Sequence, residues 1–207
     1  MPGRFISLEG GEGVGKSTQL TALAEALRRR GLEVVETREP GGSPGAEAIR
    51  RLLLEGGDDR WTPEAEALLF AAARADHVAR TIRPALERGA WVLSDRFLDS
   101  SLAYQGAAAG VGVDTVRQLH WFGSHGFLPD RTLLLALSPE AVAARLSVRD
   151  AGGSDRIGGR GGEFHDRVAE SFGQLANEEP QRFRRIDASG EPEEVTARLL
   201  AAVGDLL

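Results

Sequence analysis

The stretch FISLEGGEGVGKST, residues 5–18, decides the fold of this chain. It opens with the apolar run Phe5-Ile6-Ser7-Leu8, which is typical of a buried strand. It continues as Gly10, four residues and then Gly15-Lys16-Ser17, which is the G-x-x-x-x-G-K-[ST] pattern of a phosphate-binding loop. Apolar residues at helical spacing follow, so we predict that a helix begins near Lys16. The strand, the loop and the helix therefore occur in the order that the motif requires.

The residue types of this loop suit a nucleoside triphosphate. Glycines let the backbone approach a phosphate closely, and consecutive amide N–H groups form a nest at the positive end of the helix. Lys16 supplies a charge for the β- and γ-phosphates, and Ser17 supplies a hydroxyl for Mg²⁺. The alternative is a glycine-rich turn with a chance lysine. The predicted nucleotide-binding residues are Gly10, Gly11, Glu12, Gly13, Val14, Gly15, Lys16, Ser17 and Thr18.

Length and composition limit the class of protein. The chain has 207 residues, so we expect one domain over residues 1–207. The formal net charge of −6 disfavours a general nucleic-acid binder. The absence of cysteine excludes disulfides, thiolate zinc sites and cysteine nucleophiles. The start has no signal-like apolar region, and no apolar run approaches 18 residues, so we expect an intracellular protein without a membrane partner.

Strand and helix patterns alternate along the chain. Strands are predicted at 5–8, 33–37, 91–96, 131–137 and 182–188. Helices are predicted from Lys16 and at 46–54, 63–88, 100–110, 115–125, 140–148, 164–176 and 193–206, with a kink expected at Pro84. This order implies an α/β fold with a five-stranded, mainly parallel sheet between helices, and ligands at the carboxyl ends of the strands. We interpret the glycine-rich segment 149–162 as a mobile lid.

The run DRFLDSSLAYQG, residues 95–106, closely resembles the signature of thymidylate kinases. Taken alone, Asp95 could equally cap a helix. Four further motifs match this family in order: TREPGG at 37–42, LLFAAAR at 68–74, DRI at 155–157 and IDA at 186–188. The resemblance therefore covers nearly the whole chain, and it implies the three-layer, P-loop NTPase-like fold of the bacterial members.

The resemblance implies an ATP-dependent dTMP kinase. Such an enzyme transfers the γ-phosphoryl group of ATP to dTMP, which gives dTDP and ADP in cytoplasmic dTTP synthesis. Ser17 and Asp95 would hold Mg²⁺. A homodimer is also implied, and the helices around 63–88 and 114–125 could form its interface, although Trp121 and Phe122 could equally be core residues.

The resemblance also implies which residues hold dTMP. Two guanidinium groups suit a phosphate dianion, aromatic rings suit the base and the sugar, and the remaining polar groups complete the contacts. Arg38 and Arg96 would hold the phosphate, Phe70 would stack on thymine, Arg74 would donate to a thymine carbonyl, Ser101 and Gln105 would complete these contacts, Tyr104 would contact the deoxyribose, and Glu12 would lie near the 3′-hydroxyl. Outside this context, Phe70 and Tyr104 could be core residues, Arg74 a solvated helix residue and Glu12 an exposed loop acid.

The arginines of the predicted lid indicate which residue supplies a catalytic positive charge. Family members without a basic residue inside the phosphate loop carry arginines in the lid, and residues 11–14 contain no basic residue. We rank Arg156 first and Arg149 second as the arginine that neutralises the transferring phosphoryl group. Gly158 follows the DRI motif where an acid is common, which leaves the lid geometry open. Arg145 is a candidate to stack on adenine, or it lies on an amphipathic helix surface.

The predicted catalytic set combines the loop, the strand end and the lid: Lys16, Glu12, Asp95, Arg96, Arg149 and Arg156. Two other functions stay open from the sequence. A deoxynucleoside kinase would phosphorylate an uncharged acceptor, which the pair of Arg38 and Arg96 disfavours. A non-catalytic nucleotide-binding module would bind ATP without turnover.

Overall fold

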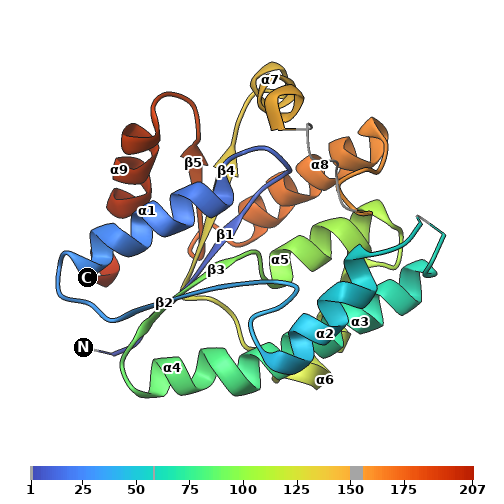
Figure 1. Cartoon of the computed structure of the whole chain (residues 1–207), viewed down its shortest axis with the longest axis horizontal. Helices are drawn as coiled ribbons and strands as arrows, with labels where there is room; N and C mark the ends of the chain where they lie inside the picture. The colour runs from blue at the N-terminus through green and yellow to red at the C-terminus, as the bar shows by residue number, and fades with distance from the viewer. Residues whose placement is uncertain (1, 58, 150–155) are drawn as a thin grey trace.

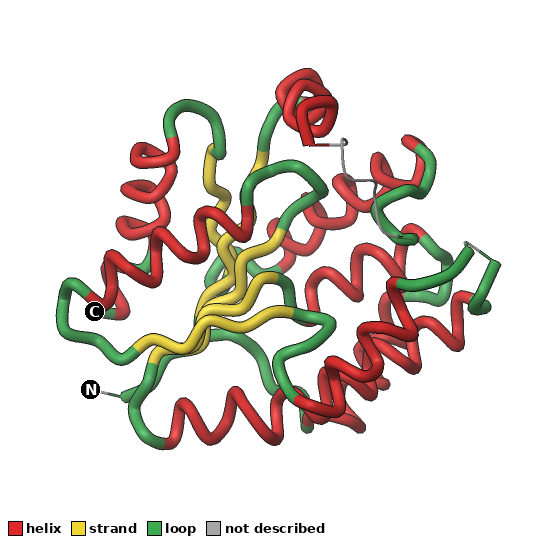
Figure 2. Tube along the Cα trace, viewed as in Figure 1, coloured by secondary structure: helices red, strands yellow, loops and turns green. Residues whose placement is uncertain are grey.

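A computed structural model describes residues 2–57, 59–149 and 156–207. Its sheet has five strands, and every pairing is parallel. The strands run in the order β2-β3-β1-β4-β5, with β1 in the centre (Figure 2). Their bounds are β1 (Phe5–Glu9), β2 (Val34–Arg38), β3 (Trp91–Asp95), β4 (Arg131–Ala136) and β5 (Phe183–Asp187). The predicted five-stranded parallel α/β sheet is therefore confirmed.

Helices cover both faces of this sheet. The α-helices are α1 (Lys16–Arg28), α2 (Pro44–Leu54), α3 (Pro63–His77), α4 (Arg83–Glu87), α5 (Leu98–Ser101), α6 (Val113–Ser124), α7 (Pro139–Arg149), α8 (Gly162–Glu178) and α9 (Pro192–Ala202). Helices α1 and α9 lie together on one side of the sheet, and α4, α5 and α8 lie on the other (Figure 1). None of the helices in the described ranges is long and apolar enough to cross a membrane.

Two hydrophobic cores result from this layering. Ile6 and Leu8 of β1 belong to the core under α1 and α9, whereas Phe5 belongs to the core on the opposite face. Leu93 and Val92 of β3 divide between the two cores in the same way. Because side chains alternate across a strand and both faces are buried, each strand is apolar along most of its length. This arrangement fixes the central strand, and with it the loop that follows β1.

The helix predicted over 63–88 is interrupted at its centre. A wide π-helical segment, η1 (Val78–Ile82), joins α3 to α4, and Pro84 lies in the first turn of α4. Proline has no amide hydrogen and disturbs the preceding turn, so the wide turn stands where the kink was expected. A second π-helical segment, η2 (Leu102–Ala108), continues α5 in the predicted helical stretch.

Most predicted bounds lie within two residues of those in the structure, and the ends of the third strand and of the closing helix illustrate the differences. The third strand was predicted to include Arg96, but Arg96 has a positive φ of 69° and lies outside β3. The closing helix was predicted to run to Leu206, but α9 ends at Ala202 and a 3₁₀ turn, η4 (Gly204–Leu206), follows.

Within the predicted lid, residues 150–155 lie outside the described residues. Ile157 is described and is buried against the core below α8.

Candidate active site

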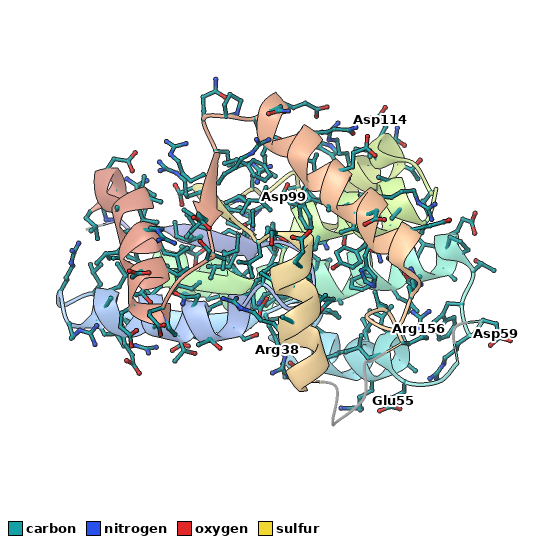
Figure 3. The ribbon with its side chains drawn as sticks, turned by 90° about the horizontal axis from the view of Figure 1, so that it is seen from above. Arg38, Glu55, Asp59, Asp99, Asp114 and Arg156 are labelled. Atoms are coloured by element: carbon teal, nitrogen blue, oxygen red, sulfur yellow. The ribbon has the colours of Figure 1, made fainter. Side chains whose placement is uncertain are left out.

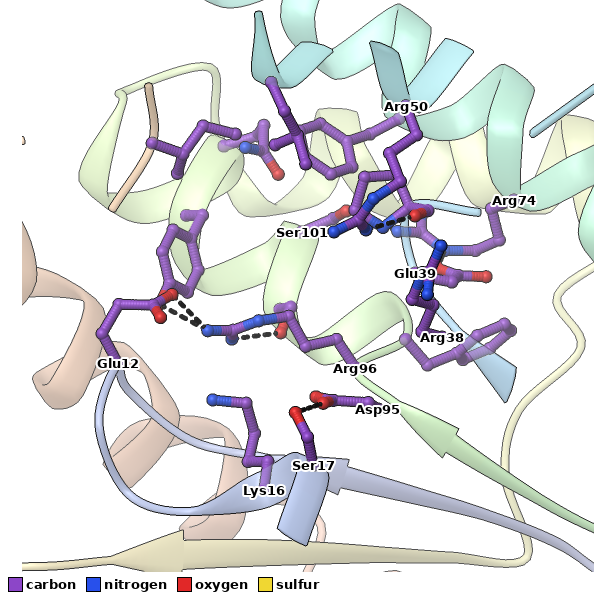
Figure 4. Close-up of a pocket in the computed structure, with 18 of the residues that line it drawn as sticks. Glu12, Lys16, Ser17, Arg38, Glu39, Arg50, Arg74, Asp95, Arg96 and Ser101 are labelled. Carbon is purple, nitrogen blue, oxygen red and sulfur yellow. Dashed lines mark hydrogen bonds and ion pairs between the residues drawn. The ribbon is translucent and has the colours of Figure 1, made fainter. Parts of the chain in front are cut away.

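One cavity of about 580 Å³ opens at the carboxyl ends of the strands (Figure 4). Its walls come from the loop after β1, the end of β2, α3, the end of β3 and η2. Most of the predicted site residues line it: Glu12, Gly13, Gly15, Lys16, Ser17, Thr18, Arg38, Phe70, Arg74, Asp95, Arg96, Ser101, Tyr104, Gln105 and Arg145. The fold therefore brings together residues that lie up to 133 positions apart in the sequence.

The phosphate-binding loop requires glycine at its two ends. Gly10 has φ of 136°, and a Cβ there would lie 2.5 Å from the carbonyl oxygen of Leu135. Gly15 has φ of 94° and is the N-cap of α1. Only glycine adopts these conformations without strain. The loop therefore passes close to β4 and turns its amides toward the N-terminus of α1, as an anion site requires.

Lys16 lies across the mouth of this loop. Its Nζ donates to the carbonyl oxygens of Gly10 at 3.2 Å and Gly11 at 2.7 Å, and the residue is 7% exposed. Burial, together with the nearby charge of Arg96, lowers the pKa of Lys16 to about 8. The nearby carboxylates of Glu12 and Asp95 act against this lowering. The ammonium group is thus held at the loop but is easily deprotonated.

ATP binding is therefore expected to weaken above about pH 8. Phosphates favour the ammonium form of Lys16, so binding takes up a proton wherever the free amine predominates, and affinity falls by up to about tenfold per pH unit. Lys16 is the only lysine of the chain. Labelling of Lys16 by an amine-reactive reagent can therefore be followed by mass spectrometry from about pH 7 to about pH 10. The labelling should show a midpoint near pH 8, and ATP should protect Lys16 from the reagent.

Glu9, the last residue of β1, also has a pKa of about 8. A variant of Glu9 is therefore the control for the labelling midpoint of Lys16. In Glu9→Gln, the labelling midpoint of Lys16 should fall slightly, because one nearby negative charge is lost. A midpoint near 10.4, the usual lysine value, in the unmodified protein would contradict the assignment.

Ser17 and Asp95 form an oxygen-rich pair beside Lys16. The Ser17 hydroxyl donates to Asp95 Oδ2 at 2.5 Å (Figure 4). A hydroxyl and a carboxylate are hard ligands that suit Mg²⁺, which keeps several waters and binds through few protein groups. The described residues contain no cluster of three or more acidic, histidine or cysteine side chains that could hold a metal by itself. The pair fits an ion that is shared with substrate phosphates.

Arg96 is the centre of a hydrogen-bond cluster above the loop. Its Nη1 donates to the Gly10 carbonyl at 2.9 Å and to Ser100 Oγ at 3.0 Å. Its Nη2 donates to Glu12 Oε1 at 2.6 Å and to Tyr104 Oη at 3.1 Å. Burial opposes the charge, but Tyr104 and Glu12 raise the pKa of Arg96 above its usual value. These contacts hold a left-handed backbone that is unfavourable for arginine.

Glu9 supports this cluster from below, although the sequence motifs did not indicate it. Its Oε1 accepts the amide of Phe97 at 2.7 Å, and its Oε2 accepts the Ser100 hydroxyl at 2.5 Å. Burial, with the nearby Asp99, raises the pKa of Glu9 to about 8. An acid at the end of an apolar strand was the available signal. Glu9 fixes Ser100, which in turn contacts Arg96.

Arg74 extends from α3 and lines the same cavity. Its Nε donates to Glu39 Oε2 at 2.8 Å, and its Nη2 donates to Ser101 Oγ at 2.5 Å. His77 lies 3.0 Å from the other Glu39 oxygen and 2.7 Å from Thr37 Oγ1. Burial alone would raise the pKa of Glu39. Arg74 and His77 together lower this pKa by more than burial raises it, so the net shift is downward. The sequence motif contained Glu39, but its role as the partner of Arg74 was not predicted.

The remaining predicted residues flank this wall. Arg38 ends β2 and is exposed, with its guanidinium 3.2 Å from the Glu47 carboxylate. Gln105 donates to Glu66 at 2.9 Å. Arg145 on α7 donates to the Val14 carbonyl at 3.2 Å and to the Ala188 carbonyl at 3.1 Å, which brings it beside the phosphate loop. The cavity also includes Pro40, Arg50, Leu54, Phe97, Ser100 and Ile157, which were not predicted.

Arg156 lies elsewhere than its predicted catalytic place. Its side chain is buried between α2 and α3, where Nε donates to the Leu53 carbonyl at 2.9 Å and Nη2 pairs with Glu66 (Figure 3). Arg160 donates to the same Glu66 oxygen at 2.6 Å. In this conformation Arg156 does not line the cavity, because the buried acid and the carbonyl hold its guanidinium. The side chain of Arg149 lies outside the described part of the chain.

Comparison with known proteins gives one consistent result. A family model described as thymidylate kinase matches residues 8–199. A thymidylate kinase of Rhizorhabdus wittichii is 67% identical over 207 residues, which is the full length of both chains. Thymidylate kinases of Caulobacter vibrioides and a Synechococcus strain are 49% and 50% identical, over 95% and 96% of this chain and 94% of theirs. The chain belongs to the thymidylate kinase family.

Proposed function

We propose that the chain is an ATP:dTMP phosphotransferase, which moves the γ-phosphoryl group of ATP to the phosphate of dTMP. The observation that carries this proposal is the continuity of the cavity, because it joins the phosphate-binding loop to a wall formed by Phe70, Arg74 and Gln105. Such a cavity holds a triphosphate at one end and a planar base at the other. We also propose that residues 1–207 form one domain, since all five strands belong to one sheet.

The donor site lies at the loop after β1. Its amides and Lys16 bind the β- and γ-phosphates, and the guanidinium of Arg145 lies against the adenine. Ser17 and Asp95 hold Mg²⁺, which neutralises charge on the donor phosphates when it is bound. The short contact between these two side chains supports this assignment, because it brings both oxygens to one point beside Lys16.

The acceptor site lies across the cavity. Arg38 and Arg96 bind the phosphate of dTMP, Phe70 stacks on thymine, and Tyr104 contacts the deoxyribose. Glu12 approaches the 3′-hydroxyl from the loop. Tyr104 and Glu12 both contact Arg96, so the groups proposed for sugar and phosphate form one cluster. This cluster fixes the distance between the phosphate-binding arginine and the sugar.

The reaction requires positioning and charge neutralisation more than proton transfer. An oxygen of the dTMP phosphate attacks the γ-phosphorus of ATP, the bond to the β–γ bridging oxygen breaks, and ADP leaves. The attacking oxygen is already ionised, so no general base is needed. Lys16 and Arg96 both line the cavity and lie near each other (Figure 4), which supports a role for two cations where charge develops in the transfer.

A panel of acceptors tests this function. Purified protein with ATP and Mg²⁺ is given dTMP, dUMP, dCMP, AMP or thymidine, and ADP release is followed in a coupled assay. We expect the highest kcat/KM with dTMP. Preferential phosphorylation of thymidine would indicate a deoxynucleoside kinase, and ATP binding without turnover on any acceptor would indicate a non-catalytic module.

Arg74→Ala is expected to raise the KM for dTMP by about 10- to 100-fold and the KM for ATP by less than about twofold. The reason is that Arg74 lies on the acceptor side of the cavity, away from the phosphate-binding loop. Steady-state kinetics with each substrate varied in turn will measure both values. Thermal unfolding is needed as well, because Glu39 loses its buried partner and the loss costs about 3–5 kcal/mol.

Arg80→Ala is the matched control for Arg74→Ala. Arg80 is an exposed arginine six residues later that pairs with Asp76 on the surface. Its replacement should change neither KM. Equal increases of both KM values in Arg74→Ala would remove Arg74 from the base site.

We further propose that the protein is a homodimer through α3 and α6. These helices pack against each other, and they carry the exposed apolar residues Leu68, Trp121 and Phe122, which are 56%, 72% and 86% exposed. Phe122→Glu is expected to convert the dimer to a monomer in sedimentation velocity. Leu207→Glu, an exposed apolar residue at the end of the chain, is the control and should leave the mass unchanged. A monomeric unmodified protein would contradict the proposal.

A further inference from the structure

Glu66 is a buried acid behind the acceptor wall. It lies on α3 and is 1% exposed. Glu66, Phe70 and Arg74 follow at intervals of four residues, so they share one face of the helix. Phe70 and Arg74 line the cavity, whereas Glu66 is covered by Gln105 from η2. The reaction proposed above gives Glu66 no role.

The two oxygens of Glu66 have different partners. Oε2 accepts from Arg156 and from Arg160, the latter at 2.6 Å. Oε1 accepts from Gln105 Nε2 at 2.9 Å. A carboxylate oxygen accepts hydrogen bonds and cannot donate them. Because the two guanidinium groups hold Oε2, the acid presents Oε1 to Gln105 as an acceptor only.

This contact determines which way the Gln105 amide faces. Asparagine and glutamine amides are oriented by their hydrogen-bond partners, and an acceptor demands the NH₂ group. The NH₂ of Gln105 therefore faces Glu66. The carbonyl oxygen Oε1 has no hydrogen-bond partner among the described residues, and Gln105 lines the cavity. The cavity wall thus offers a carbonyl acceptor from Gln105 and guanidinium donors from Arg74.

An acceptor beside a donor matches one type of pyrimidine edge. Thymine and uracil carry a carbonyl at C4 and an N–H at N3, which pair with a donor and an acceptor respectively. Cytosine carries the reverse pattern, an amino group at C4 and an unprotonated N3. A Gln105 amide turned the other way would present NH₂ to N3 and would favour cytosine.

We propose that Glu66 is a specificity-determining positioning residue: its carboxylate holds the Gln105 amide so that the carbonyl oxygen faces the acceptor base and selects a pyrimidine with an N3–H. This inference rests on the proposed function, because it takes the base to lie against Phe70 and Gln105. It also assigns Arg156 and Arg160 a role on the acceptor side, since they reserve one oxygen of Glu66 and leave the other for Gln105.

Glu66→Gln is the central test. The one remaining oxygen of the new amide is claimed by Arg156 and Arg160, so its NH₂ group faces Gln105 and forces the Gln105 amide to turn over. The ratio of kcat/KM for dTMP to that for dCMP is expected to fall on the order of 10²-fold, because a donor now opposes N3–H. A purely structural role would lower both values together and leave the ratio unchanged, which would overturn the proposal.

Glu64→Gln is the matched control, since Glu64 is an exposed acid in the first turn of the same helix. Its dTMP-to-dCMP ratio should equal that of the unmodified protein. Because Glu66→Gln leaves two arginines without a buried counter-charge, the double variant Glu66→Gln/Arg156→Met is measured in parallel. The double variant removes one of these cations. If Glu66→Gln alone does not fold, the dTMP-to-dCMP ratio of kcat/KM in the double variant decides the test.

A substrate analogue separates this proposal from the proposed function. The N3-methyl analogue of dTMP has N–CH₃ in place of N3–H, so it loses this donor and keeps the C4 carbonyl. In the unmodified protein it should be used about 10- to 100-fold less well than dTMP, and in Gln105→Met this difference should disappear. If Gln105→Met preserves the difference, the base does not lie at Gln105 and the site assignment fails. If Gln105→Met abolishes it but Glu66→Gln does not, only the role of Glu66 fails.

Discussion

Replacement of Lys16 by alanine is expected to reduce kcat by at least about 10³-fold. The ammonium group is the only lysine charge in the chain, and it lies at the loop carbonyls of Gly10 and Gly11. In the proposed reaction, its removal takes away a cation that stabilises the β–γ bridging region as the bond breaks. Phosphoryl transfer depends mainly on positioning and on electrostatic stabilisation of this kind. Coupled ADP release at saturating ATP and dTMP measures the loss.

The fold should survive this change. The Nζ of Lys16 bonds loop carbonyls, and its charge is disfavoured by burial, so the variant should unfold at an equal or higher temperature than the unmodified protein at pH 7. Lys16→Arg is the informative control. It keeps a charge but brings a larger, planar head group into the loop, and it should recover little activity. A kcat near that of the unmodified protein in Lys16→Ala would contradict the assignment of the loop.

The fold could be predicted from the sequence because its signals are local. The strand, glycine-rich turn and helix around Gly15 each follow from a few neighbouring residues. The alternating strands and helices then leave one layered arrangement. The errors occur where tertiary contacts decide. Arg96 leaves β3 because its guanidinium is held by Glu12 and Gly10, which are distant in sequence.

The sequence indicated most of the residues that line the cavity, but it did not indicate the residues that support them. Family motifs indicated Arg74, but nothing local to the motif indicated that Glu39 and His77 would orient it. Glu66 had a usable signal, since it precedes Phe70 by one helical turn on the face that also carries Arg74. Supporting residues depend on pairs that meet only after folding, so spacing alone identifies few of them.

Arg149→Ala is expected to reduce kcat by about 10³- to 10⁵-fold, the range of an arginine that neutralises a transferring phosphoryl group. We propose Arg149 for this role over Arg156, in reverse of the ranking from sequence. Arg149 is the last residue of α7 and follows Arg145 by four residues. Arg145 donates to the Val14 carbonyl in the phosphate-binding loop, and the spacing of four residues in the sequence is the reason for choosing Arg149. Single-turnover phosphoryl transfer with ATP and dTMP will separate chemistry from product release.

Arg156→Met supplies the contrast to Arg149→Ala. Because Arg156 is held by Glu66 and the Leu53 carbonyl, its loss should lower the unfolding temperature and raise the KM for dTMP, with a far smaller effect on kcat. Arg167→Ala, an exposed arginine on α8, controls for loss of charge and should match the unmodified protein. Added guanidinium ion should restore part of the single-turnover rate to Arg149→Ala and none to Arg156→Met. A larger loss of kcat in Arg156→Met than in Arg149→Ala would return the catalytic role to Arg156. Only a residue that reaches the transferring phosphoryl group changes the rate of the chemical step by about 10³- to 10⁵-fold.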